Sequence, residues 1–112
     1  MNQAMFNEVV AEQFKACGDL LIHKGADYSD GGDRLSNFKV NAARLDMTPV
    51  QVWAIYFIKH INAIETFVKK GKLSSEPIEG RIDDAINYLI LLRALVKEGQ
   101  HSDKDNKGIA AL

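Results

Sequence analysis

Residues 48–70 read TPVQVWAIYFIKHINAIETFVKK, and this stretch decides the fold. Thr48 is a typical helix N-cap, Pro49 suits the first helical position, and Gln51 stands where it can complete a capping box. At the other end two lysines precede Gly71, a residue type that commonly ends helices. The stretch therefore predicts one long α-helix with a defined start and stop.

Apolar residues recur along this helix in two stripes at three- and four-residue spacing. The first stripe consists of Val50, Ala54, Phe57, Ile61, Ile64 and Val68, and the second of Trp53, Tyr56, His60 and Phe67. Stripes at this spacing mark helix faces that pack against other elements.

Three further helices are predicted around it. Residues 3–24 carry apolar side chains at helical spacing, and residues 36–45 form a shorter amphipathic segment. Residues 77–98 follow a helix-start signal and run to a glycine. No strand, repeat or linker is indicated, so the predicted fold class is all-α, a four-helix bundle.

The helical segments fit one domain over residues 1–99, a size at which a modest core can form. Gly25 is the predicted C-terminal cap of the first helix, and Gly99 is the predicted end of the last one. Residues 100–112 are polar without a period and predict a flexible C-terminal tail.

The last helix contains AINYLILLRALV, residues 85–96, which is apolar nearly all round apart from Asn87 and Arg93. A helix of this kind is buried on most sides. A four-helix monomer of this size has no interior that could surround it, so we expect a homodimer or a higher oligomer with this helix central.

The composition of the chain disfavours some classes of binding partner and some cellular locations. A net charge of −1 over 112 residues disfavours a coat for duplex nucleic acid or an anionic-membrane binder. The N-terminal residues lack the order of a signal peptide, and no apolar run reaches bilayer length. Cys17 is the only cysteine and is expected to fill core space, which favours a reducing, cytoplasmic location.

The loop region KGADYSDGGDRLSNF, residues 24–38, raises the question of a metal site. Counted from Asp27, the pattern of an EF-hand calcium loop fails, because Phe38 stands where the bidentate Glu is required. Zinc is disfavoured, since one cysteine and three scattered histidines offer no paired ligand spacing.

Magnesium remains open, because two carboxylates and a substrate phosphate can hold it. Asp83 and Asp84 open the last helix, and Asp84 lies one turn before Asn87. Glu8 and Glu12 are one turn apart on the first helix, where a solvated face is the ordinary interpretation.

A second group of residues combines cations, amides and aromatic rings. Its members are Lys24, Tyr28, Arg34, Asn37, Trp53, Tyr56, Lys59, His60, Arg81, Asn87 and Tyr88. Such a mixture suits a nucleotide, because rings stack on bases while arginine and lysine meet phosphates. Each member also has a plain structural explanation: a buried histidine, core aromatics or a lysine with its stem on apolar surface.

The runs KGADYSDGGDRLSNFK, TPVQVWAIYFIKHINAI and EPIEGRIDDAINYLILLRAL resemble a group of small phage-encoded proteins described as MazG-like or nucleotide-modification-associated. The resemblance covers about residues 5–98. It implies an all-α fold, a dimer or tetramer, and hydrolysis of nucleoside triphosphates at a metal site of E-x-x-E and E-x-x-D motifs. Here Glu8 and Glu12 are separated by three residues rather than two, and Glu79 with Asp83 or Asp84 departs from the second spacing.

Three hypotheses follow from the residues and the resemblance. In the first, the protein binds and sequesters a small cyclic or ADP-ribose-type nucleotide immune signal in the host cytoplasm, without a cofactor. In the second it is a magnesium-dependent pyrophosphohydrolase, with Glu8, Glu12, Asp27 and Asp84 around the metal. In the third it is a structural or adaptor dimer. The sequence favours the binder, because the polar cluster is richer in cations, amides and rings than in carboxylates.

For the binder, the expected roles divide by chemistry. The phosphates are expected to pair with Lys24, Arg34, Lys59 and Arg81. The base is expected to stack on Trp53, Tyr56 or Tyr88, and directional hydrogen bonds are expected from His60, Asn37 and Asn87.

Overall fold

The computed structural model of the chain describes the backbone of residues 1–24 and 32–110 and the side chains of residues 1–23 and 32–100. Within these residues the protein is helical and forms no strand, so the predicted all-α fold class is confirmed. Among them no helix combines the length and the apolar character needed to cross a membrane.

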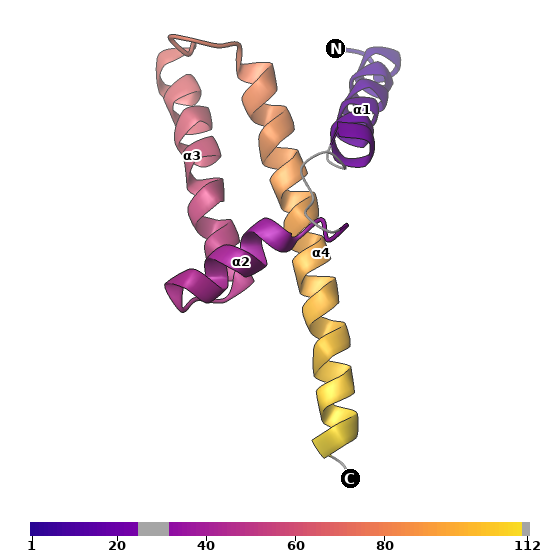
Figure 1. Ribbon diagram of the computed structural model, residues 1–112. Coiled ribbons are helices and arrows are strands. Elements are labelled where there is room, and N and C mark those ends of the chain that lie inside the picture. Colours follow the sequence, from indigo (N-terminus) through magenta and orange to yellow (C-terminus); the bar gives the residue numbers. More distant parts are fainter. Residues whose placement is uncertain (25–31, 111–112) are drawn as a thin grey trace.

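The elements in chain order are α1 (Gln3–Gly18), the π-helix η1 (Asp19–Lys24), α2 (Ser36–Leu45), α3 (Pro49–Lys70) and α4 (Ile78–Ala110). The helices α3 and α4 lie side by side and run antiparallel, as Figure 1 shows. The short α2 crosses near the start of α3, and α1 lies on the opposite side of α4 from α3 (Figure 1). The antiparallel pair α3–α4 is therefore the frame to which the other elements attach.

Local signals set both ends of α3. The Thr48 hydroxyl accepts the Gln51 backbone N–H at 3.1 Å, and the Gln51 side-chain oxygen accepts the Thr48 N–H at 2.9 Å. This reciprocal capping box satisfies two amide groups that the first helical turn leaves free. At the far end Gly71 adopts φ 76°, a left-handed conformation that glycine reaches without a Cβ clash. The predicted start and stop of this helix are confirmed.

Helix α4 does not end where the sequence predicts. The helix continues through Gly99 to Ala110, so the predicted stop at Gly99 is wrong. Gly99 is absent from the glycines with positive φ in the described chain, whereas Gly71 is one of them. A glycine inside a helix costs only about 1 kcal/mol relative to alanine, so glycine alone does not end one.

The predicted first helix over residues 3–24 is helical throughout but changes type within its length. The α-helical hydrogen-bond pattern ends at Gly18, and Asp19–Lys24 form η1. A π-turn contains an extra residue per turn and is found mostly as a local insertion in α-helices. The change places Leu20 and Leu21, both half-buried, beside α2 and α4.

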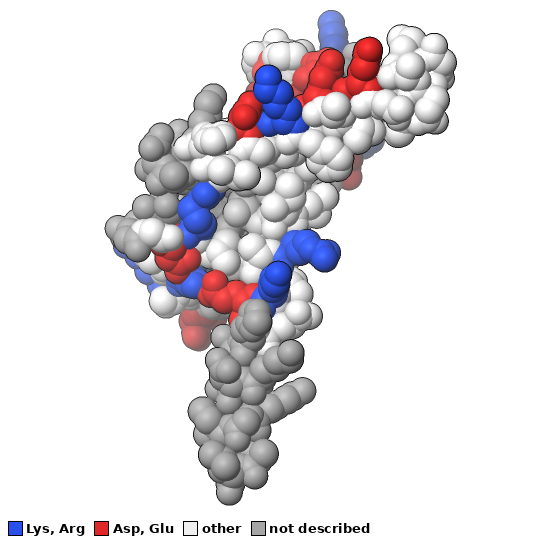
Figure 2. All heavy atoms as spheres, turned by 90° about the vertical axis from the view of Figure 1, so that its right-hand side faces the viewer, with Lys and Arg blue, Asp and Glu red and all other residues white. Residues whose placement is uncertain are grey.

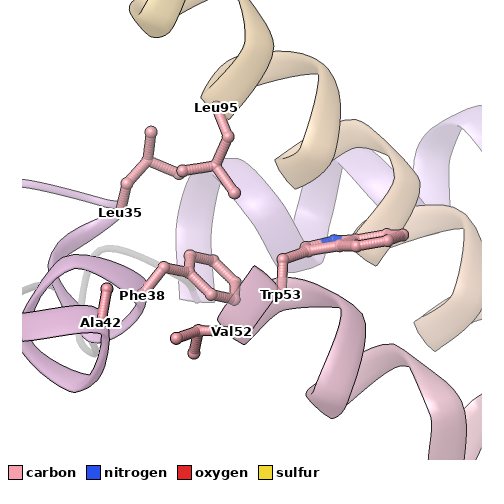
Figure 3. Close-up of a cluster of buried hydrophobic side chains, with 6 residues drawn as sticks. All are labelled: Leu35, Phe38, Ala42, Val52, Trp53 and Leu95. Carbon is pink, nitrogen blue, oxygen red and sulfur yellow. The ribbon is translucent and has the colours of Figure 1, made fainter. Parts of the chain in front are cut away.

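The core lies where α2, α3 and α4 meet. It consists of Leu35, Phe38, Ala42, Val52, Trp53 and Leu95, whose side chains converge in Figure 3. Trp53 stacks on Phe57 with ring centroids 4.6 Å apart, and its indole N–H donates to the backbone oxygen of Tyr88 at 2.6 Å. Since that bond joins α3 to α4, Trp53 fixes the spacing of the helix pair.

The two stripes of α3 have different environments. In the second stripe Trp53 and His60 are buried. In the first stripe Val50, Ile61 and Val68 remain exposed. The second stripe is therefore covered, whereas the first stripe is covered only in part, where Phe57 stacks on Trp53.

Candidate functional site

A cavity of about 250 Å³ opens between η1, α2, α3 and α4. Its lining residues are Leu20, Leu21, Arg34, Ser36, Asn37, Phe38, Tyr56, Asp84, Asn87, Tyr88 and Leu91. Five of the residues selected from the sequence as nucleotide ligands, Arg34, Asn37, Tyr56, Asn87 and Tyr88, are among them. The cavity thus brings together residues separated by more than fifty positions in the chain.

Asn87 is the unusual member of this lining. Its side chain is only 4% exposed, and neither its amide nitrogen nor its amide oxygen has a hydrogen-bond partner within the described residues. Leaving a buried amide unpaired costs about 1–3 kcal/mol per group, and buried polar groups are otherwise nearly always paired. Asn87 borders the cavity and its buried amide has no partner within the described residues, so a ligand that reached it would satisfy both the donor and the acceptor.

Aromatic rings surround this amide. Phe38 lies 6.0 Å from Tyr56 and 6.4 Å from Tyr88, measured between ring centroids. The Tyr56 hydroxyl accepts a hydrogen bond from the Asn41 amide at 2.8 Å, which orients the ring. Burial raises the pKa of Tyr88 above its ordinary value, so its phenol stays protonated and can donate. The cavity offers ring surfaces and neutral hydrogen-bonding groups.

The start of α2 holds the rim of the cavity. Asp33 accepts the Leu35 backbone N–H at 2.9 Å and pairs with Lys39 at 2.8 Å. The Lys39 hydrogen bond keeps the pKa of the Asp33 carboxyl below its usual value. Asp33 therefore has a structural role in the turn, and the neighbouring Arg34 and Asn37 are exposed at the rim.

His60 and Arg81 lie beside the cavity rather than in its lining. The ring of His60 is 4.9 Å from that of Tyr88, and its Nδ1 is 3.4 Å from the Arg81 guanidinium. Because a guanidinium only donates, Nδ1 accepts and the proton of the neutral ring is on Nε2, which has no partner within the described residues. Arg81 also pairs with Glu76.

Burial lowers the pKa of His60 below its ordinary value, and the nearby Lys59 and Arg81 act in the same direction. Asp84, whose carboxylate is 3.9 Å from Nδ1, opposes this, but desolvation is the larger effect. His60 is therefore neutral at pH 7, and its contact with Asp84 is not an ion pair there.

This environment predicts a pH dependence of stability. The unfolded chain protonates His60 near pH 6.5, whereas the folded chain does so only at lower pH, so acid favours the unfolded state. We expect the free energy of unfolding to fall below about pH 6.5, by up to about 1.4 kcal/mol per pH unit from this group. In His60→Gln, the part of the pH dependence of the free energy of unfolding that comes from His60 should disappear. Urea denaturation between pH 7 and about pH 5 measures it.

The matched control is His23→Gln, because His23 is exposed. It should leave the slope unchanged. Equal slopes in the wild type and His60→Gln would contradict the assignment of a buried neutral ring.

The remaining four candidates are not among the described lining residues of the cavity. Trp53 belongs to the core, and Lys59 is exposed outside the lining. Tyr28 and the side chain of Lys24 lie outside the described residues.

The carboxylates considered for magnesium do not converge in the part of the chain that is described. Glu8 and Glu12 are exposed on α1, Asp84 lines the cavity, and Asp27 lies outside the described residues. Within residues 1–23 and 32–100, whose side chains the structure describes, no cluster of three or more histidine, cysteine, aspartate or glutamate side chains is placed to hold a metal ion. Asp83 is occupied by a hydrogen bond from Gln13 at 2.8 Å.

Several lining residues were not selected from the sequence as ligands: Leu20, Leu21, Ser36, Phe38 and Leu91. Most are apolar, and periodicity marks such residues as core without indicating that they border a cavity. Asn41, which orients Tyr56, was also missed. Its position one turn from Asn37 on the same helix is the one signal that was available.

Figure 2 shows the distribution of charge on one face of the molecule. Lys and Arg alternate with Asp and Glu in two groups, and uncharged surface lies between the groups (Figure 2). Among the described residues on this face, neither sign of charge forms an extended patch.

Comparison of the chain with protein families, with curated proteins and with solved structures finds no match.

Proposed function

We propose that this protein binds a small nucleotide in the cavity between η1, α2, α3 and α4, and that it holds the nucleotide without hydrolysing it. The observation that carries the proposal is Asn87, a buried amide whose donor and acceptor both lack a partner within the described residues while the residue borders the cavity. A ligand with an adjacent acceptor and donor would satisfy both groups.

A nucleobase has this pattern on its edge. An asparagine amide forms a paired hydrogen bond with the adjacent donor and acceptor of adenine, and stacking on aromatic rings adds to such binding. Phe38, Tyr56 and Tyr88 supply the ring surfaces around Asn87. This combination supports a base rather than an aliphatic ligand as the part that enters.

The phosphates would remain at the rim. The cavity volume of about 250 Å³ is slightly below the roughly 300–1,000 Å³ of ordinary ligand pockets. It therefore suits a base or nucleoside, with the charged part of the ligand outside. Arg34, exposed at that rim, is the cation placed to meet a phosphate.

Sequestration accounts for the cavity better than hydrolysis does. Asp84 is the one carboxylate among the described lining residues of this cavity. Magnesium sites for phosphoryl chemistry use carboxylates together with substrate phosphates. The ratio of rings and amides to carboxylates among the described lining residues supports a binder of a cyclic or ADP-ribose-type signal, acting in the cytoplasm as an anti-defence sponge, rather than the hydrolase that the family resemblance implies.

The test is to incubate the purified protein with a panel of linear, cyclic and ADP-ribose-type nucleotides, with and without magnesium. After gel filtration the protein is heated, and the released material is analysed by chromatography. We expect one nucleotide to be retained and released intact in either condition. Release of pyrophosphate only with magnesium would establish the hydrolase instead, and retention of no nucleotide would overturn the proposal.

A further inference from the structure

Two polar residues of α4 border the cavity one turn apart. Asp84 and Asn87 are both lining residues, and they are three positions apart on the helix. Side chains at this spacing are neighbours on a helix surface, with Cβ atoms about 5–6 Å apart. A base that reaches the Asn87 amide therefore also meets the Asp84 carboxylate.

Asn87 alone does not select one purine over the other. Because no group within the described residues fixes its amide, the amide can turn over and offer its donor and acceptor in either order. One order pairs with the N6 amino group and N1 of adenine, and the reversed order pairs with O6 and N1–H of guanine. Selection between the two bases requires a second polar residue in the lining.

The Asp84 carboxylate can only accept hydrogen bonds. Within the described residues its oxygens accept none, and the one basic group within ion-pair distance is His60, whose Nδ1 lies 3.9 Å away. Nδ1 has no proton to donate, because it accepts from Arg81 in the neutral ring. The Asp84 side chain is 45% exposed, so a base that covers it displaces water and has to bring a donor in its place.

Guanine is the common base whose edge satisfies the donor and acceptor of Asn87 together with the acceptor of Asp84. Its Watson–Crick edge has the O6 acceptor, the N1–H donor and the N2 amino donor in that order. Adenine has a C–H beside N1, so in either direction it satisfies at most two of the three groups. Cytosine and uracil place a carbonyl oxygen against a carboxylate or amide oxygen, which is repulsive.

We propose, as an inference that rests on the proposed function, that the cavity selects a guanine nucleotide. The Asn87 amide pairs with O6 and N1–H, and the Asp84 carboxylate accepts from the N2 amino group. Asp84 is then the residue that determines base specificity, because a polar site rejects a ligand that leaves its groups unpaired. This favours a cyclic guanine nucleotide over an ADP-ribose-type ligand, whose base is adenine.

Hypoxanthine tests the Asp84 contact, because it is guanine without the N2 amino group. The probes are the monophosphates, cyclic monophosphates and cyclic dinucleotides of guanine, hypoxanthine, adenine, cytosine and uracil, titrated into the full chain by isothermal titration calorimetry. In the form that binds most tightly, we expect guanine to bind about tenfold to a hundredfold more tightly than hypoxanthine. Adenine should bind at least about tenfold more weakly than guanine.

Asp84→Ala removes the acceptor and should reduce the preference for guanine over hypoxanthine to within about threefold. The matched control is Asp83→Ala, which removes a carboxylate from the same turn of α4. Asp83 is not among the described lining residues and accepts a hydrogen bond from Gln13, so the control should keep the preference. Far-UV circular dichroism checks that both variants are folded.

Equal affinity of the wild type for guanine and hypoxanthine nucleotides would overturn the inference, and this comparison does not depend on the folding of any variant. A preference for guanine that persists in Asp84→Ala would overturn the role of Asp84. Tightest binding of an adenine, cytosine or uracil nucleotide would overturn the selection of guanine but leave the proposed function intact. Binding of none of the probes would overturn the proposed function and the inference together.

Discussion

Replacement of Trp53 by alanine is expected to lower the free energy of unfolding by about 3–5 kcal/mol. The side chain is 8% exposed, stacks on Phe57 and donates to the backbone oxygen of Tyr88. The substitution removes an indole from the junction of α2, α3 and α4 and leaves a cavity there. Urea denaturation followed by far-UV circular dichroism measures the loss, because Trp53 is the only tryptophan and its fluorescence disappears with it.

The variant Trp53→Phe separates the two contributions. It keeps an aromatic ring against Phe57 but has no N–H for the Tyr88 oxygen. We expect it to lose about 1–2 kcal/mol. Equal losses in the two variants would show that the hydrogen bond, rather than the buried ring, holds the helices together. A loss below about 1 kcal/mol in Trp53→Ala would contradict the position of the indole in the core.

The second large effect concerns Asn87, where we expect stability and binding to change in opposite directions. Asn87→Leu replaces a buried amide that has no partner within the described residues by an apolar side chain of similar size, so it should raise the free energy of unfolding by about 1–3 kcal/mol. The same substitution removes the donor and acceptor offered to a ligand. Nucleotide retention in the heat-release assay should therefore be lost. Urea denaturation and the release assay measure the two effects on one preparation.

Asn41→Leu is the matched control for this variant. Asn41 is a half-buried asparagine whose amide donates to Tyr56 and to the backbone oxygen of Asn37. Its loss leaves partners unpaired, so we expect about 1 kcal/mol of destabilisation. If Asn87→Leu destabilises the protein by about as much as Asn41→Leu does, the Asn87 amide is satisfied in the folded protein. A ligand at this position would then not be needed to pair the amide.

The ends of the helices show what a local signal can and cannot predict. Thr48, Gln51 and Gly71 act through contacts within a few residues, so the boundaries of α3 follow from the sequence. Gly99 is the same residue type as Gly71, but it lacks a left-handed conformation and α4 continues past it. The change to η1 at Asp19 has no sequence signal that we recognise.

The sequence predicts which types of residue form the site, but not which individual residues border the cavity. Periodicity identifies two apolar stripes on α3, yet it does not say which one the chain itself covers. For the same reason periodicity does not distinguish Trp53, a core residue, from Tyr56, which borders the cavity. Both lie on the stripe selected from the sequence. Asn87 stands out in the sequence as an amide in an apolar helix, but its lack of partners within the described residues depends on the packing of α4 against its neighbours.

The long α4 also affects how the size of the particle can be measured. Its 33 residues span about 50 Å, and the longest dimension of the chain is 58 Å against 32 Å and 27 Å for the others. The radius of gyration is 17.4 Å, whereas a compact chain of this length has about 13 Å. A rod of this shape diffuses more slowly than a sphere of equal weight and leaves a gel-filtration column early. A single copy would therefore elute like a heavier globular standard, and the number of copies has to be obtained from light scattering or native mass spectrometry.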